Sequence, residues 1–136
     1  MTVSILLVDD DDVAREAMIR SLKKNRIHIP VIEAEDGFVA LRIIQGTHPE
    51  LKIEKPFIIF LDLNMPRMDG FEFLNLVRGD PKTADTVIYV ISTSNAEEDQ
   101  KMAYSKNVAG YLVKSTVGQD FSILSHLMDQ KAADAT

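Results

Sequence analysis

Hydrophobic residues gather into five short runs along the chain, each of the length of a β-strand. The runs cover residues 3–8, 30–34, 57–61, 87–91 and 108–113. Most of them are continuous rather than alternating, which is typical of strands that helices cover on both faces, as in a parallel sheet. The pattern therefore favours an α/β fold.

Segments with helical spacing of apolar residues lie between these runs. The first ends at the basic pair Lys23 and Lys24, which suits the carboxyl end of a helix because its dipole favours cations there. The next two precede Gly46 and Gly79, and glycine can end a helix in the left-handed conformation. The sequence thus predicts a helix after each of the first three strands.

The second half of the chain adds two more helical segments. Residues 96–106 begin with an acidic turn, and residues 120–131 carry apolar residues on one stripe before an expected fraying tail at 132–136. The stretch 46–56 contains two prolines and is long for a helix-to-strand connection, so we expect a surface loop there. Five strands and five helices in alternation predict right-handed crossovers and a doubly wound open sheet.

Length and composition narrow the class of protein. A chain of 136 residues is long enough for one core, so we expect a single domain over residues 1–136, ordered from about residue 4 to 131. A net charge of -6 argues against a nucleic-acid partner, and the absence of cysteine excludes thiolate chemistry and disulfides. Neither a signal peptide nor a run long enough to span a membrane is present, so we expect a cytoplasmic protein with no membrane partner.

Residues that can bind a metal ion or an anion follow the first, third, fourth and fifth apolar runs. In a doubly wound sheet the carboxyl ends of the strands form the site, so these side chains should converge. They are Asp9 to Asp12 after the first run, Asp62 and Asn64 after the third, Ser92 after the fourth and Lys114 after the fifth. Several carboxylates, a hydroxyl and an ammonium group are therefore expected at one edge of the sheet.

This combination of groups predicts a phosphoryl site. Clustered carboxylates repel one another unless a cation neutralises them, and hard oxygen ligands suit Mg²⁺. Lys114 can hold an anion and Ser92 can donate a hydrogen bond to it. Asp62 would then be the nucleophile that accepts a phosphoryl group, with Mg²⁺ offsetting the charge.

Four blocks of the sequence resemble the bacterial two-component receiver family. They are Val8-Asp9-Asp10, the stretch Phe-Leu-Asp-Leu-Asn-Met-Pro-Arg-Met-Asp-Gly at 60–70, Val90-Ile91-Ser92, and Gly110-Tyr111-Leu112-Val113-Lys114. The resemblance extends from about residue 4 to 128, and the block around Asp62 is its most specific part. It implies a flavodoxin-like sheet of five parallel strands in the order 2-1-3-4-5 with five helices.

The resemblance also implies a role for each matched residue. Asp62 would be the phospho-acceptor, and the ligands of Mg²⁺ would be Asp10 directly, Asp9 through water, Asp62, and Asn64 through its backbone carbonyl. The groups that respond to the phosphate would be the switch hydroxyl of Ser92, the pairing cation Lys114 and the aromatic ring of Tyr111. One departure is Ser115, where the family usually has proline after the lysine, so a cis bond at that place is far more costly.

The implied function is a signalling switch rather than an enzyme. A sensor histidine kinase or a histidine phosphotransfer protein would phosphorylate Asp62, and a partner protein, a homodimer or a phosphorelay would read the result. The chain would assist only its own phosphoryl transfer and autodephosphorylation. The Ser92-Thr93-Ser94 spacing and the 46–56 loop resemble stand-alone receivers that partner phytochrome-type histidine kinases.

Other interpretations compete with these assignments. Asp11 or Asp12 can cap the first helix, Ser92 can be an ordinary strand-end hydroxyl, and Tyr111 a packed surface aromatic. An aspartyl-phosphate phosphatase would need a second acid near the nucleophile and a cap domain, but position 64 is asparagine. A phosphate-independent scaffold would predict broken site residues, whereas every matched residue is present.

Overall fold

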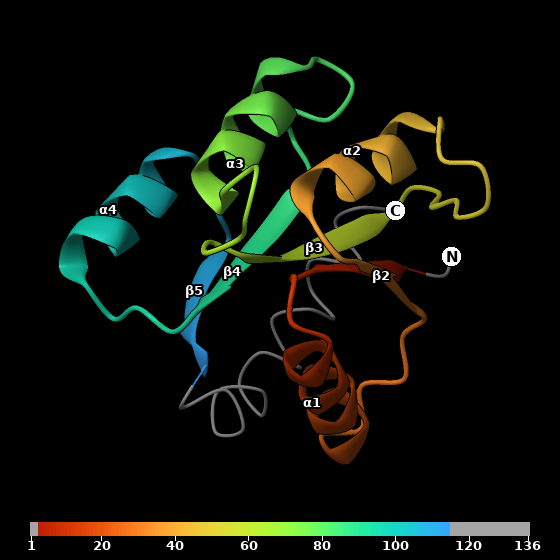
Figure 1. Cartoon of the computed structure of the whole chain (residues 1–136), viewed down its shortest axis with the longest axis horizontal. Coiled ribbons are helices and arrows are strands. Elements are labelled where there is room, and N and C mark those ends of the chain that lie inside the picture. Colours follow the sequence, from red (N-terminus) through yellow and green to blue (C-terminus); the bar gives the residue numbers. More distant parts are fainter. Residues whose placement is uncertain (1–2, 115–136) are drawn as a thin grey trace.

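A computed structural model describes residues 3–114, and their elements follow the predicted alternation (Figure 1). The strands are β1 (Ser4–Val8), β2 (Val31–Ala34), β3 (Phe57–Asp62), β4 (Val87–Ser92) and β5 (Gly110–Val113). The helices are α1 (Asp12–Lys24), α2 (Gly37–Gln45), α3 (Gly70–Gly79) and α4 (Glu97–Ser105). The helix expected at 120–131, the tail and the Lys114–Ser115 bond lie outside the described residues.

All five strands pair in parallel in the order β2-β1-β3-β4-β5, which confirms the predicted flavodoxin-like topology. Figure 1 shows α1 on one side of the sheet and α2 and α3 on the other. Two buried clusters follow from this layering. One packs the sheet against α2, α3 and Ala103 of α4, and the other packs it against Met18 and Leu22 of α1. Because both faces are covered, β3 is buried along its whole length, as its continuous apolar run predicts.

Aspartates begin three of the four described helices. Asp11 accepts hydrogen bonds from the amides of Val13 and Ala14 at the start of α1, while Asp36 caps α2 and Asp69 caps α3. Each side chain satisfies a backbone amide that has no partner within its helix. The expected capping role of Asp11 is confirmed, which leaves Asp9 and Asp10 outside the helix.

The two glycines expected to end helices behave differently. Gly46 follows α2 with φ 77°, in the left-handed conformation that its sequence position predicts. At Gly79 the prediction is wrong, because this residue is the last of α3 and the chain leaves through Asp80 in an extended conformation. The buried Thr83 donates its hydroxyl to the carbonyl of Val77 at 2.7 Å, so a side chain satisfies the end of α3.

Arg78, near the end of α3, forms hydrogen bonds with two neighbouring loops. Its guanidinium donates to the carbonyls of Lys106 (2.8 Å), Ala84 (2.8 Å), Thr86 (2.7 Å) and Asn107 (3.1 Å). The loop from Asp80 to Thr86 leads into β4, and the residues after α4 lead into β5. One side chain therefore holds the starts of two strands together.

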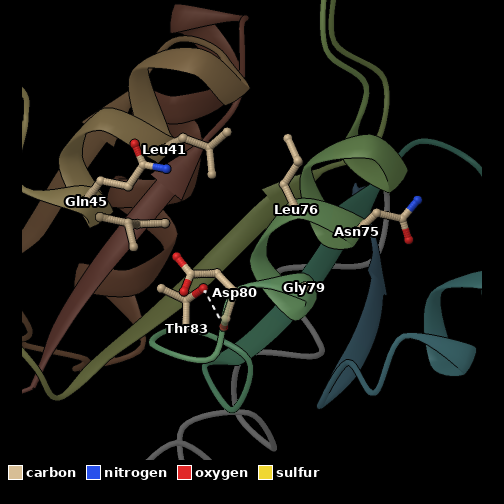
Figure 2. Close-up of a pocket in the computed structure, with 8 residues that line it drawn as sticks. Leu41, Gln45, Asn75, Leu76, Gly79, Asp80 and Thr83 are labelled. Carbon is tan, nitrogen blue, oxygen red and sulfur yellow. Dashed lines mark hydrogen bonds between the residues drawn. The ribbon is translucent and has the colours of Figure 1, made fainter.

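A shallow groove of about 350 Å³ lies between α2 and α3 (Figure 2). Leu41, Ile44 and Leu76 supply apolar surface, and Gln45, Asn75, Asp80 and Thr83 surround them. These residues lie from the middle to the end of α2 and α3, and Asp80 and Thr83 follow α3, so the groove lies at the opposite edge of the sheet from the carboxyl ends of the strands. Among the described helices, none is both long enough and apolar enough to cross a bilayer.

Candidate phospho-acceptor site

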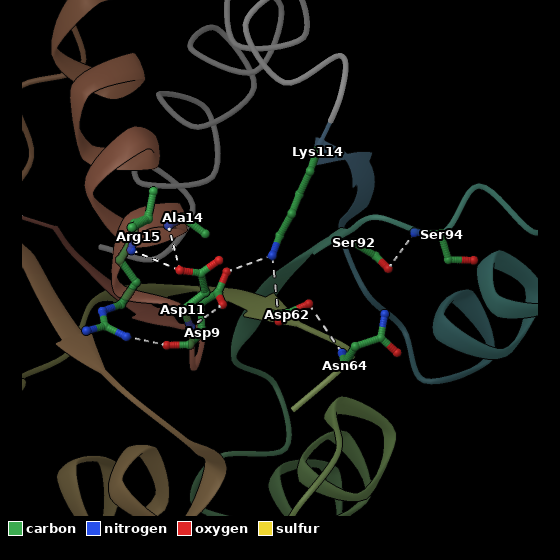
Figure 3. Close-up of polar contacts among 10 residues, drawn as sticks. Asp9, Asp11, Ala14, Arg15, Asp62, Asn64, Ser92, Ser94 and Lys114 are labelled. Carbon is green, nitrogen blue, oxygen red and sulfur yellow. Dashed lines mark hydrogen bonds and ion pairs between the residues drawn. The ribbon is translucent and has the colours of Figure 1, made fainter. Parts of the chain in front are cut away.

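Four strands bring the predicted polar residues to one edge of the sheet (Figure 3). Asp9 follows β1 and Lys114 follows β5, while Asp62 and Ser92 are the last residues of β3 and β4. The parallel register aligns Val8 with Leu61 and Asp62 with Ile91, so these strands end at nearly the same level. The convergence expected from the sequence is therefore present.

Three carboxylates form the centre of this edge. Asp9, Asp10 and Asp62 each offer an oxygen atom, and these atoms lie within 4.8 Å of one another. Asp9 and Asp62 are 4% exposed, whereas Asp10 is open to solvent. Burial of two neighbouring carboxylates is unfavourable unless cations offset their charge.

Lys114 provides one such cation. Its Nζ atom lies 2.9 Å from Oδ2 of Asp9 and 3.7 Å from Oδ2 of Asp62. Burial acts to lower the pKa of Lys114, but the hydrogen bond to Asp9 and the charges of Asp62, Asp9 and Asp11 outweigh it and raise the pKa. Lys114 therefore remains an ammonium group at neutral pH.

Asp62 is nevertheless a perturbed acid. Burial first, and the charge of Asp9 second, raise its pKa to about 6 from the ordinary 3.8. Lys114 opposes this rise, as does the backbone amide of Asn64, which donates to Oδ1 at 3.2 Å. A further positive charge at the site would therefore stabilise the ionised form of Asp62.

Asp9 is held in place by the amide of Asp11 and by Arg15, a residue that the sequence did not single out. The amide of Asp11 donates to its Oδ1 at 3.0 Å, and Arg15 donates to its backbone carbonyl at 2.6 Å. Arg15 also pairs with Glu33 of β2 at 3.1 Å. Nothing in the apolar pattern of α1 distinguishes Arg15 from a solvated basic residue, because both contacts depend on the neighbouring strand.

Ser92 and Tyr111 meet at a third residue, Ser94. Ser92 is fully buried and its Oγ atom accepts a hydrogen bond from the amide of Ser94 at 3.1 Å. The phenol of Tyr111 donates to the carbonyl of Ser94 at 2.9 Å, and the hydroxyl of Ser94 donates to Asp99 of α4 at 2.6 Å. The loop between β4 and α4 thus connects the Ser92 hydroxyl with Tyr111 and with the first turn of α4. Of the acidic residues in that turn, Glu97 and Glu98 are exposed.

Gly70 allows the loop after Asp62 to close tightly on β3. Its amide donates to the carbonyl of Leu63 at 2.8 Å. A Cβ atom at position 70 would lie 2.5 Å from Cα of Leu63 and 2.8 Å from the carbonyl oxygen of Asp62, which is too close for any side chain. Glycine is therefore required where the loop returns beneath the phospho-acceptor candidate.

The donor set suits a divalent cation. Three carboxylates supply hard oxygen ligands, which are the ligands that Mg²⁺ and Mn²⁺ take in proteins, and two of the three are buried without enough positive charge to balance them. The backbone of Asn64 lies directly beside Asp62, through the hydrogen bond between the Asn64 amide and Oδ1. The residues present therefore fit such an ion.

The chain is similar in sequence and fold to response regulators. Residues 5–122 match the model of the response regulator receiver domain. The response regulator Rcp1 of Synechocystis is 32% identical over 82% of this chain and 76% of its own length, and its Mn²⁺-bound crystal structure superposes with a TM-score of 0.72 at 31% identity, covering 83% of this chain and 81% of that one.

Two further proteins extend the comparison. The phosphorylated cyanobacterial phytochrome response regulator RcpA superposes with a TM-score of 0.74 at 26% identity, covering 91% of each chain. The transcriptional regulatory protein YdfI of Bacillus subtilis is 31% identical over 92% of this chain, which spans only 53% of YdfI. The order of the strands in this chain agrees with the response regulator receiver domain family. The chain belongs to this family of two-component systems, because the family match covers most of its length and one relative is 32% identical.

Proposed function

We propose that this chain is a phosphorylation-dependent switch in which Asp62 accepts a phosphoryl group from a sensor histidine kinase or a histidine phosphotransfer protein. The observation that carries the proposal is the placement of Asp62, which is buried at a strand end beside Asp9, Asp10 and Lys114. In the transfer, a carboxylate oxygen of Asp62 bonds to phosphorus as the bond from phosphorus to the donor's histidine nitrogen breaks, and the electron pair stays on that nitrogen. An ionised carboxylate needs no general base.

We assign Mg²⁺ to the acid cluster, which consists of Asp9, Asp10 and Asp62. Asp9, Asp10, Asp62 and the backbone carbonyl of Asn64 would hold the ion, with Asp9 acting through water. Mg²⁺ supplies charge neutralisation for the carboxylates and for the phosphoryl oxygens in the transfer. Lys114, which pairs with Asp9 and Asp62, lies within reach of a phosphoryl group on Asp62 and would pair with it.

We assign the conformational response to phosphorylation to the loop between β4 and α4. When the Ser92 hydroxyl donates to a phosphoryl oxygen, it turns away from its contact with the Ser94 amide. Ser94 also receives the hydrogen bond of Tyr111, so the same shift frees the tyrosine to change rotamer. The phosphate at the strand ends would thereby alter the exposed surface beside α4 and β5.

The partners and setting follow from this assignment. The whole chain, residues 1–136, would act as one receiver domain in the cytoplasm, read by protein contacts that include a homodimer or a phosphorelay protein. Similarity to RcpA, a phytochrome response regulator, favours a phytochrome-type histidine kinase as the donor. The chain would catalyse nothing beyond its own phosphorylation and dephosphorylation.

Intact-protein mass spectrometry after incubation with acetyl phosphate tests the proposal. Wild type should gain one phosphoryl group only when Mg²⁺ is present, and hydroxylamine should remove it. Asp62→Asn should gain nothing, whereas the matched control Asp69→Asn, which alters the exposed cap of α3, should gain as wild type does. The proposal fails if folded wild type gains no mass from acetyl phosphate or from phosphorylated histidine kinases, or if Asp62→Asn is still modified.

A further inference from the structure

The tip of the loop after Asp62 has an unusual backbone conformation. Arg67 has φ 66°, in the left-handed region that glycine adopts freely and side chains disfavour. The amide of Met68 donates to the carbonyl of Pro66 at 2.7 Å, so Arg67 is the middle residue of a three-residue turn. This conformation is unfavourable for a non-glycine residue, and contacts with surrounding groups can offset its cost.

Those contacts are made by the Arg67 side chain. Its guanidinium forms an ion pair with Oδ2 of Asp36 and lies 5.5 Å from the centre of the Phe38 ring. Asp36 is 3% exposed, and its other oxygen accepts a hydrogen bond from the amide of Val39 at 2.8 Å. One buried carboxylate therefore both caps α2 and receives the arginine from the loop.

A second contact locks the same two segments together. A Cβ atom at Gly37, the first residue of α2, would lie 2.7 Å from Sδ of Met68. The residue after Arg67 therefore packs directly against the backbone of α2. The loop therefore contacts the start of α2 through its tip residue Arg67 and through the next residue, Met68.

We propose that Arg67 is a positioning residue for the metal site, because its attachment to Asp36 fixes the loop backbone that carries Asn64. Only the buried Met65 and the conformationally restricted Pro66 separate Asn64 from Arg67, so a shift at the tip is transmitted to Asn64. The Asn64 amide already bonds Asp62, and its carbonyl is the assigned ligand. This inference rests on the proposed function, since it presumes a divalent cation at the acid cluster.

Mn²⁺ binding, measured from the electron paramagnetic resonance signal of the free ion, tests the inference without phosphorylation. Arg67→Ala and Asp36→Asn should each weaken Mn²⁺ affinity about tenfold, as removal of groups that orient metal ligands commonly does. Arg67→Lys keeps the charge and should recover part of the loss. The double variant should be no weaker than either single one, because both changes break the same pair.

Two further variants separate the side chain from the turn. Arg67→Gly relieves the backbone conformation but removes the ion pair, so it should bind Mn²⁺ as weakly as Arg67→Ala. Arg26→Ala is the matched control, because Arg26 is also exposed with φ 60° but lies after α1, at the opposite edge of the sheet. It should bind Mn²⁺ as wild type does.

The amide resonance of Asn64 provides a readout that needs no metal. It should move in Arg67→Ala and in Asp36→Asn but stay in place in Arg26→Ala. The inference is overturned if folded Arg67 variants bind Mn²⁺ like wild type, if Arg67→Gly regains full affinity, or if Arg26→Ala weakens binding equally. Failure of wild type itself to bind Mn²⁺ would instead refute the proposed metal site.

Discussion

Replacing Asp62 by asparagine should stabilise the folded chain, because it removes one charge from a crowded acid cluster without changing the shape of the side chain. Burial and then Asp9 raise the pKa of Asp62 from 3.8 to about 6, even with Lys114 beside it. Each pKa unit corresponds to about 1.4 kcal/mol, so keeping Asp62 ionised at neutral pH destabilises the fold by about 3 kcal/mol. We expect Asp62→Asn to exceed wild type in free energy of unfolding by about 2 to 3 kcal/mol in EDTA.

The pH dependence of this difference has a definite sign. Because the pKa of Asp62 is higher in the folded chain than in the unfolded chain, the folded chain binds more protons between about pH 4 and pH 6. The contribution of Asp62 to stability is therefore fully present below about pH 4 and is lost as the pH rises through 6. Subtracting the variant from wild type cancels the titrating groups that do not interact with Asp62.

Urea unfolding followed by circular dichroism measures both effects. The advantage of Asp62→Asn should be largest near about pH 7.5 in EDTA and should shrink near about pH 5. It should also shrink in Mg²⁺, since the ion stabilises wild type and the variant has lost a ligand. Asp69→Asn is the control, because asparagine caps a helix as well as aspartate does. Equal stability of wild type and Asp62→Asn near pH 7.5 in EDTA, or a difference that ignores pH, would refute the reasoning.

Three other substitutions test separate features. Lys114→Met should raise the pKa of Asp62 above about 6, because the positive charge of Lys114 lowers that pKa in wild type. A carbon-13 titration of the Asp62 carboxyl group measures the pKa, and an unchanged value would contradict the pairing. Arg78→Met should lower the free energy of unfolding by about 3 kcal/mol, since four backbone carbonyls lose a charged donor. Arg20→Met, which breaks an exposed ion pair with Glu16, is the control, and an equal loss of stability in both variants would count against the role of Arg78. Gly70→Ala should cost about 1 to 3 kcal/mol, because its Cβ would meet the Leu63 backbone. Gly79→Ala, where a Cβ meets nothing, should be neutral or stabilising, and a Gly70→Ala chain as stable as wild type would disprove the close packing.

The strands and the residues at their ends could be predicted from the sequence because one physical rule governs both. A parallel strand covered on two faces gives a continuous apolar run, and the end of that run marks the edge where the site is built. Asp9, Asp62, Ser92 and Lys114 therefore came to one edge as expected, with the carboxylates close together.

Contacts between elements distant in the sequence escaped prediction. The ion pair between Arg67 and Asp36 joins positions 31 residues apart. From the sequence, Asp36 indicates no more than a helix cap. Arg78 reads as a basic residue in the last turn of a helix, whereas its guanidinium binds backbone carbonyls of other segments. The wrong expectation at Gly79 has a local origin, because the hydroxyl of Thr83, in the loop directly after α3, donates to the carbonyl of Val77.

The strand order also determines how much of the chain is needed to complete the site. β1 and β3 are neighbours, so the strands that bring the carboxylates of Asp9, Asp10 and Asp62 together both lie within the first 62 residues. Lys114 follows β5, the last of the described strands, so the ammonium group that pairs with Asp9 comes from a much later part of the chain. A chain cut before β5 would keep all three carboxylates but lose the lysine that offsets their charge.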